Sequence, residues 1–132
     1  MIPLLDLVGL IKSNDHEVYD VAPARGSEVI VRIARQTEHR LEAERWVLDA
    51  ARASGVATQQ VLLLEQTEFE GKLLMICIEE KMCGRSLDEL MDAGEDVSEV
   101  IPQLEVLLGR IHNVKTEGFG YLLSNGKGWE IP

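Results

Sequence analysis

The sequence predicts an α+β fold, with an antiparallel sheet of about five strands, one helix packed on it, and the first helices of a second unit. Three observations indicate this class. Short apolar runs rich in branched residues alternate with turn residues over the first part of the chain. One longer segment with helical periodicity, at about 37–54, interrupts them. After Gly84 no strong strand pattern remains, so we expect a sheet-based unit at 1–84 and the beginning of an incomplete helical unit at 85–132.

The sheet-based unit divides into strands joined by turns. Residues 4–11 are apolar and fit either a first strand or a short lead-in helix. The other expected strands, each bounded by glycine, proline or polar turn residues, are 17–22, 28–35, 61–65 and 73–80. The helix at 37–54 precedes the last two of these strands and stops at Gly55. The acidic run 65–70 predicts a solvated hairpin.

The second unit is expected to hold two helices. Ser86 and Glu89 form a capping box, in which each side chain bonds the backbone N–H of the other residue, and Gly94 ends this short helix. A second helix runs to about Asn113, with Pro102 in its first turn, where no backbone hydrogen bond is lost. Its apolar stripe consists of Leu104, Leu107, Leu108 and Ile111. The unit 85–132 is too short to provide other elements that could bury this stripe.

Two opposite charges occupy positions where the pattern predicts burial. Arg32 lies in the middle of the strand 28–35, which is apolar on both faces. Glu44 lies near the middle of the apolar stripe of the helix that follows. Burying either charge alone would cost roughly several kcal/mol, so we expect the two side chains to pair. The pattern fits a structural salt bridge and a phosphate-holding pair equally well.

The composition excludes several classes of function. The chain has 13 Lys and Arg against 23 Asp and Glu, a net charge of −10 and a pI near 4.7, which argues against nucleic-acid and membrane partners. The two cysteines, Cys77 and Cys83, are too few and wrongly spaced for a zinc site or a disulfide scaffold. No metal site is expected, because His16, His39 and His112 are scattered. Reduced thiols and the absence of a signal peptide or long apolar segment favour a cytoplasmic protein.

Five segments occur in an order that is more specific than any of them alone. They are the strand 29–33 with Arg32, the helical segment 42–48 with Glu44, the segment 78–87 that ends in a Gly-Arg-Ser-Leu turn, the helix end 108–112, and the glycine-rich segment 118–128. Together they resemble the aminoglycoside phosphotransferase-like branch of the protein-kinase-like fold, which includes choline, homoserine and antibiotic kinases. The resemblance covers about residues 13–129, and within the family the chain is most similar to the antibiotic kinases.

The resemblance implies a nucleotide-binding lobe followed by an interlobe linker. Arg32 would contact the phosphates of ATP or GTP, and Glu44 would hold Arg32 in place. The backbone at Glu80, Lys81 and Met82 would bind the edge of the base. Asn14 and Asp15 would lie in the loop over the phosphates. Mg²⁺ would accompany the nucleotide, and a hydroxyl of a small molecule, which could be cationic, would accept the phosphoryl group.

The chain departs from this family at two places. The loop 12–17 contains no glycine, so less backbone can approach a triphosphate. Phosphoryl transfer also needs a catalytic Asp and an Asn and Asp for Mg²⁺, which the family supplies from a later loop. No such motif follows His112, and Asp96 is the last aspartate, so this span contains no catalytic or metal-binding residue and should be inactive by itself.

Three interpretations follow. In the first, the chain is the nucleotide-binding portion of a kinase, and Arg32→Ala should weaken nucleotide binding with little loss of fold. Glu44→Ala should instead destabilise, because a buried cation loses its partner. In the second, the chain is a non-catalytic kinase-like remnant or interaction module, with self-association through the helix face 104–111. In the third, it is an unrelated α+β ligand-binding domain.

Overall fold

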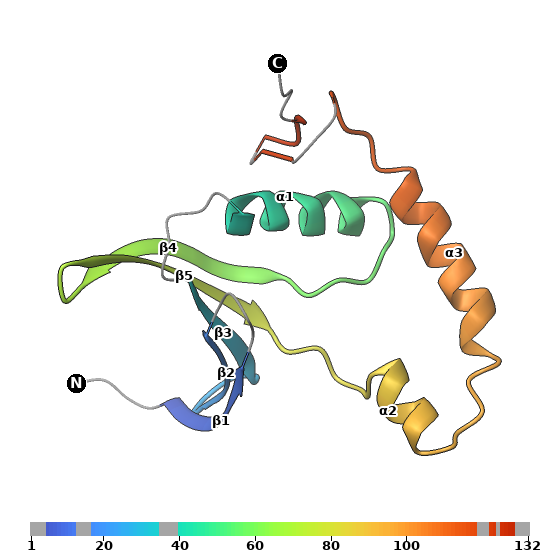
Figure 1. Ribbon diagram of the computed structural model, residues 1–132, viewed down its shortest axis with the longest axis horizontal. Helices are drawn as coiled ribbons and strands as arrows, with labels where there is room; N and C mark the ends of the chain where they lie inside the picture. The colour runs from blue at the N-terminus through green and yellow to red at the C-terminus, as the bar shows by residue number, and fades with distance from the viewer. Residues whose placement is uncertain (1–4, 13–16, 35–39, 119–121, 124, 129–132) are drawn as a thin grey trace.

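The computed structural model describes residues 5–12, 17–34, 40–118, 122–123 and 125–128, and the fold is α+β, as predicted (Figure 1). The elements, in chain order, are β1 (Leu5–Lys12), β2 (Glu17–Pro23), β3 (Val29–Ala34), α1 (Arg40–Ala53), β4 (Val61–Phe69), β5 (Lys72–Glu80), α2 (Leu87–Asp92) and α3 (Val100–His112). Their order follows the expected sequence of three strands, a helix, two strands and two helices. Of the two options for the start of the chain, the strand is the one observed.

All strand pairs are antiparallel, in the order β1-β2-β3-β5-β4. The central strand β3 lies between β2 and β5, so its side chains have neighbours on both sides. Arg32 stands opposite Val18 on β2 and opposite Cys77 on β5. Directly opposed residues of paired strands share a face of the sheet, and this register therefore decides which side chains can meet Arg32.

The β4–β5 hairpin is longer than predicted. The expected fourth strand ended at residue 65, but β4 continues to Phe69, which pairs with Lys72 at the start of β5. The two linking residues, Glu70 and Gly71, both have positive φ, at 50° and 73°. Two positive φ values are typical of the tight hairpin turns that match the twist of the flanking strands. The acidic run 65–70 is therefore mostly strand, and only its end is a turn.

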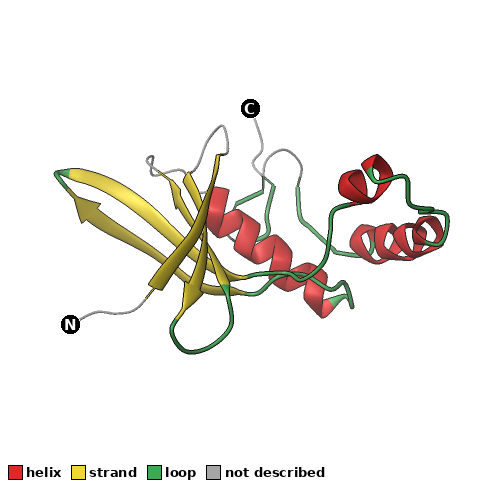
Figure 2. Cartoon of the chain, turned by 90° about the horizontal axis from the view of Figure 1, so that it is seen from below, coloured by secondary structure: helices red, strands yellow, loops and turns green. Residues whose placement is uncertain are grey.

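Helix α1 covers one face of the sheet, near β4 and β5 (Figures 1 and 2). Leu41 of α1, Ala34 of β3, and Met75 and Cys77 of β5 form the buried core between them. The helix ends at Ala53, two residues before Gly55, whose φ is +85°. The N–H groups of Gly55 and the next residue donate to carbonyls of the last helical turn, at 3.0 Å each. The predicted stop is confirmed, whereas positions 37–39 of the expected helix lie outside the described residues.

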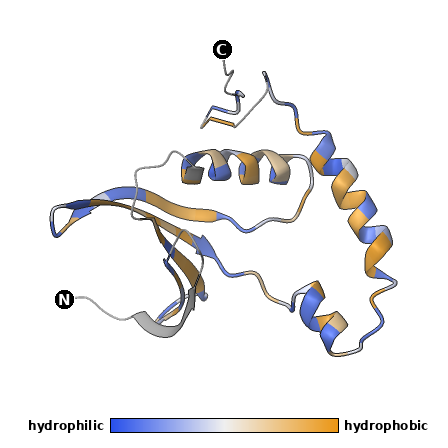
Figure 3. Ribbon diagram, viewed as in Figure 1, coloured by the Kyte–Doolittle hydropathy of each residue, from blue (hydrophilic) through white to orange (hydrophobic). Residues whose placement is uncertain are grey.

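The expected capping box and both expected helices are present. Ser86 Oγ accepts from the Glu89 N–H at 3.2 Å, and the Glu89 carboxylate accepts from the Ser86 N–H at 3.3 Å. Pro102 lies in the first turn of α3, as predicted. Neither α2 nor α3 buries a residue, and hydrophobic residues recur along α3, where the ribbon is largely orange with blue segments between (Figure 3). Arg110 ties α3 to the end of α1 through a 2.8 Å hydrogen bond to the Gly55 carbonyl.

The described part of the C-terminal segment lies on the side of α1 that faces away from the sheet (Figure 1). Gly126 is buried against Trp46 of α1, and a Cβ at this position would overlap the indole ring. Two isolated bridges, Glu117 to Lys127 and Leu122 to Gly128, organise the segment without a regular strand. No helix in the described residues is long and apolar enough to cross a membrane.

Candidate functional site

The predicted pair of Arg32 and Glu44 is present between β3 and α1. Arg32 shares a face of the sheet with Cys77, and α1 covers this face. Arg32 Nη2 donates to Glu44 Oε2 at 2.5 Å. The side chain of Arg32 is 17% exposed, whereas that of Glu44 is 44% exposed. The carboxylate is therefore less buried than its place in the helical pattern predicts, because it lies at the margin of the layer interface.

A second carboxylate, which the sequence analysis did not identify, also faces Arg32. Glu79 stands opposite Ile30 on β3, one step along the face that carries Arg32. Its Oε1 lies 3.5 Å from Arg32 Nε, and its side chain is only 9% exposed. Glu79 lies within β5, as the predicted strand 73–80 requires, although it also belongs to the segment 78–87 that resembles the family's interlobe linker. The alternation of Cys77 and Glu79 along this strand is the signal that could have revealed it.

The charges of this cluster shift the pKa values of its members. Burial would lower the pKa of Arg32, but the hydrogen bond to Glu44 and the charges of Glu79 and Glu44 outweigh burial and raise it. Burial raises the pKa of Glu79, against the opposing effect of the Arg32 charge. Burial likewise raises the pKa of the Cys77 thiol, which keeps it protonated and suits the core role expected for it. Arg32 is thus a permanent cation, and Glu79 protonates more readily than an ordinary glutamate.

Lys81 forms a second ionic cluster on the same face. Its Nζ lies 2.8 Å from Asp20 Oδ2 and 3.1 Å from Glu28 Oε2. The hydrogen bonds to Asp20 and Glu28 raise the pKa of Lys81. Asp20 stands opposite Ile30 and so shares the face that carries Arg32, whereas Glu28 and Lys81 lie just outside β3 and β5. The side chain of Lys81 is therefore engaged by one carboxylate of the sheet and by one that directly precedes β3.

The backbone that was predicted to bind a base is partly engaged. The N–H of Glu80 donates to the Gln60 carbonyl at 2.9 Å, and the Glu80 carboxylate accepts from the Gln60 N–H at 3.0 Å. The N–H of Lys81 donates to the Glu28 carbonyl at 3.4 Å. Met82 follows in an exposed, irregular segment. A ligand beside this segment would therefore meet Met82, since the N–H groups of Glu80 and Lys81 are engaged.

The remaining predicted site residues, Asn14 and Asp15, lie outside the described residues. The described members of the site form one row of charges on the α1 side of the sheet. They are the carboxylates Asp20, Glu28, Glu44 and Glu79 and the cations Arg32 and Lys81. Four negative and two positive charges give the row a formal charge of −2 when all are ionised. Each cation in the row already faces two carboxylates, so an anionic ligand must compete with them.

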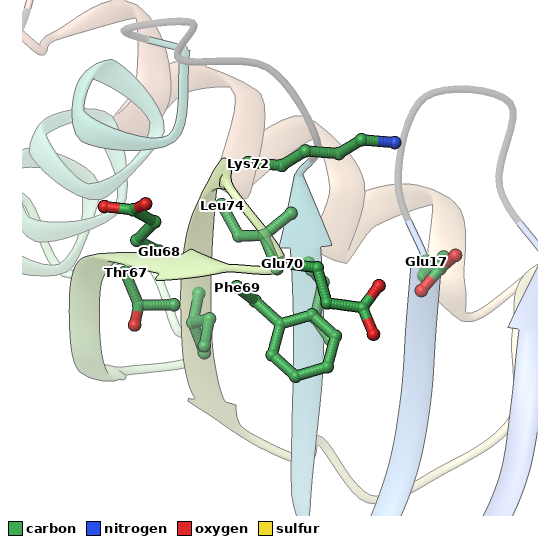
Figure 4. A pocket seen from close by; sticks show the side chains of 9 residues that line it. Glu17, Thr67, Glu68, Phe69, Glu70, Lys72 and Leu74 are labelled. Atoms are coloured by element: carbon green, nitrogen blue, oxygen red, sulfur yellow. The ribbon is translucent and has the colours of Figure 1, made fainter.

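A cavity of about 470 Å³ lies elsewhere, near the end of the β4–β5 hairpin (Figure 4). Ile33 and Ile76 line it, and these residues oppose each other across β3 and β5, next to Arg32 and Cys77 in sequence. Adjacent residues of a strand point to opposite faces, so the cavity and the row of charges are on opposite sides of the sheet. None of the predicted site residues in the described part of the chain lines the cavity. Arg32 points to the opposite face, so the cavity does not contain the expected phosphate contact.

The geometry defines an α+β protein with a strand–helix ion pair beneath its one packed helix. Comparison with protein-family models and with curated protein sequences finds no match to this chain. Within the part of the chain that the structure describes, no group of three or more His, Cys, Asp or Glu side chains could hold a metal ion.

The pH dependence of stability offers a direct test of the buried state of Glu79. Because the pKa of Glu79 is raised in the folded state, the folded protein binds more protons than the unfolded chain between the ordinary value of about 4.5 and the folded value. The contribution of Glu79 to stability is therefore largest below this window and falls as pH rises through it. Glu79→Gln cannot titrate, so its stability relative to the parent should rise with pH across the window and then level off.

This prediction can be checked by urea unfolding between about pH 4 and pH 8. Glu80→Gln is the matched control, since it removes the same charge one position along β5, on the other face of the sheet. Parallel trends in the two variants would contradict the assignment to Glu79.

Proposed function

We propose that this chain is the nucleotide-binding portion of an ATP- or GTP-dependent small-molecule phosphotransferase with a kinase-like nucleotide-binding lobe. The observation that carries the proposal is the ion pair of Arg32 on the third strand with Glu44 on the helix that follows. Protein kinases use a cation on the third strand, held by a helix glutamate, to bind the phosphates of the nucleotide. The order of strands and helices and the capped helix after the linker add support.

In this function Arg32 would contact the phosphates, and Glu44 would orient the guanidinium. The base would lie beside the segment Glu80 to Met82, using the Met82 backbone and carbonyl groups, since the N–H groups of Glu80 and Lys81 are engaged. Mg²⁺ would accompany the nucleotide and neutralise phosphate charge. The catalytic Asp and the Asn and Asp ligands of Mg²⁺ would come from a part of the protein outside this chain. The two free thiols, Cys77 and Cys83, suit a reducing compartment such as the cytoplasm.

Calorimetric titration of the chain with Mg-ATP and with Mg-GTP tests the proposal. We expect measurable binding of at least one of them, and at least about tenfold weaker binding by Arg32→Gln, because a charged hydrogen bond to phosphate is lost. Arg25→Gln, which removes an exposed cation from the turn between β2 and β3, should bind like the parent. Circular dichroism must show that each variant is folded. Absence of binding to both nucleotides, or unchanged affinity in folded Arg32→Gln, would overturn the assignment.

A second candidate, a non-catalytic interaction module, is favoured by helix α3. None of its residues is buried, although its sequence is strongly apolar. The exposed apolar side chains of α3 include Ile101, Leu104, Val106, Leu108 and Ile111. A surface of this kind typically contacts another chain or another domain. Light scattering after size-exclusion chromatography separates the two candidates: a defined dimer supports the module, and aggregation supports the nucleotide-binding portion of a kinase.

A further inference from the structure

We infer that Glu79 competes with anionic ligands for Arg32 and thereby sets the affinity of this face of the sheet for phosphate groups. The inference deepens the proposed function and rests on its assignment of Arg32 as the phosphate contact. It makes Glu79 a positioning residue that acts through Arg32 and touches no reacting atom.

The geometry places the two carboxylates along one edge of the guanidinium. Glu44 accepts from Nη2 at 2.5 Å, and Glu79 lies beside Nε at 3.5 Å. Nε and Nη2 form the edge with which arginine makes paired hydrogen bonds to a carboxylate or a phosphate. Two carboxylates from different elements therefore occupy the edge that one phosphate would use.

The contact to Glu79 is the weaker of the two and the easier to exchange. Arg32 Nε and Glu79 Oε2 are both buried, and neither has a hydrogen-bond partner among the described residues. Buried polar atoms normally have a hydrogen-bond partner, so this donor and this acceptor are each left with an unmade hydrogen bond. An anion that reached Nε would supply the missing hydrogen bond. Glu44, in contrast, already makes a short hydrogen bond and is half-exposed at the layer margin.

The charge of Glu79 opposes such an anion at short range. Glu79 is 9% exposed, so water screens its field less than that of a surface carboxylate. Glutamine in its place would keep the shape of the side chain and remove the charge. Arg32 would then face one carboxylate in place of two, and the local charge would rise by one unit. We expect Glu79→Gln to bind phosphate groups at least about fivefold more tightly than the parent.

Inorganic tripolyphosphate is the probe, because it carries phosphate charge without a base. Calorimetric titrations compare the parent, Glu79→Gln and Glu65→Gln at one ionic strength. Glu65 is exposed on β4 and stands opposite Ile76, on the other face of the sheet from Arg32. We expect tighter binding by Glu79→Gln and parent-like binding by Glu65→Gln, which lowers the net negative charge by the same amount. The double variant Arg32→Gln with Glu79→Gln should not show the increased affinity for tripolyphosphate, because that increase depends on the guanidinium of Arg32. Glu79→Met, an uncharged side chain of similar size, repeats the test if the glutamine variant does not fold.

The outcomes separate this inference from the proposed function. If the parent binds Mg-ATP or Mg-GTP through Arg32 and Glu79→Gln binds tripolyphosphate no more tightly than the parent, the inference fails and the function stands. If the parent binds neither nucleotide and Glu79→Gln gains tripolyphosphate affinity that depends on Arg32, the function fails and the inference stands. Absence of tripolyphosphate binding by both Glu79→Gln and Glu79→Met, or an equal gain in Glu65→Gln, overturns the inference.

Discussion

Arg32→Ala is expected to lower the free energy of unfolding by about 3–5 kcal/mol, as typically occurs when one partner of a buried ion pair is removed. Arg32 is the cation between Glu44 and Glu79, and Glu79 is 9% exposed. Without the guanidinium, the Glu79 carboxylate must stay buried without a countercharge or take up a proton. Urea unfolding at neutral pH, analysed with the parent slope, measures the loss.

The double variant Arg32→Ala with Glu79→Gln controls for the origin of this loss. It should regain a substantial part of the stability, because the stranded charge is gone, although the cavity left by the arginine side chain remains. Glu44→Ala should lower the free energy of unfolding by only about 1 kcal/mol, because Glu44 is 44% exposed and Arg32 retains Glu79 as a countercharge. A larger loss in Glu44→Ala than in Arg32→Ala would contradict this reading of the cluster.

This order of effects reverses the expectation from the sequence, and the reason is specific. The sequence predicted the pair of Arg32 and Glu44 correctly from apolar patterns on a strand and a helix. If the cluster held only these two charges, removing Glu44 would leave a buried cation without a partner, which is costly. Removing Arg32 would leave a carboxylate that can be neutralised by a proton, which costs less. The register of β3 against β5 adds Glu79 to the same face. Register between strands that are separated by a helix and another strand is a tertiary property, and local periodicity does not report it.

The other differences between prediction and structure have the same origin. The end of β4 was placed at residue 65 because Glu65 to Phe69 are mostly polar, but pairing with β5 extends the strand to the tight turn at Glu70 and Gly71. Long-range pairing overrides weak local propensity here. Features that depend on a few adjacent residues were predicted well. The capping box of Ser86 and the helix stop at Gly55 are examples, since each is decided by backbone geometry within one turn.

Leu41→Ala should cause the second large loss, about 2–5 kcal/mol, because it opens a cavity in the small core beneath α1. Leu41 is 2% exposed and packs with Ala34, Met75 and Cys77. It lies one helical turn before Glu44, so its packing also positions the carboxylate over Arg32. Leu62→Ala, on β4, removes the same side chain from a position that is 54% exposed and should change stability by less than about 1 kcal/mol.

The two effects of Leu41 can be separated with a double-mutant cycle. If Leu41 holds Glu44 in register with Arg32, then Leu41→Ala and Glu44→Gln together should cost less than the sum of the single losses, because the first change already weakens the ion pair. Urea unfolding of the four proteins measures this coupling. Strict additivity would mean that Glu44 reaches Arg32 without the packing of Leu41. The presence or absence of coupling therefore decides whether the apolar packing of Leu41 positions the candidate phosphate contact.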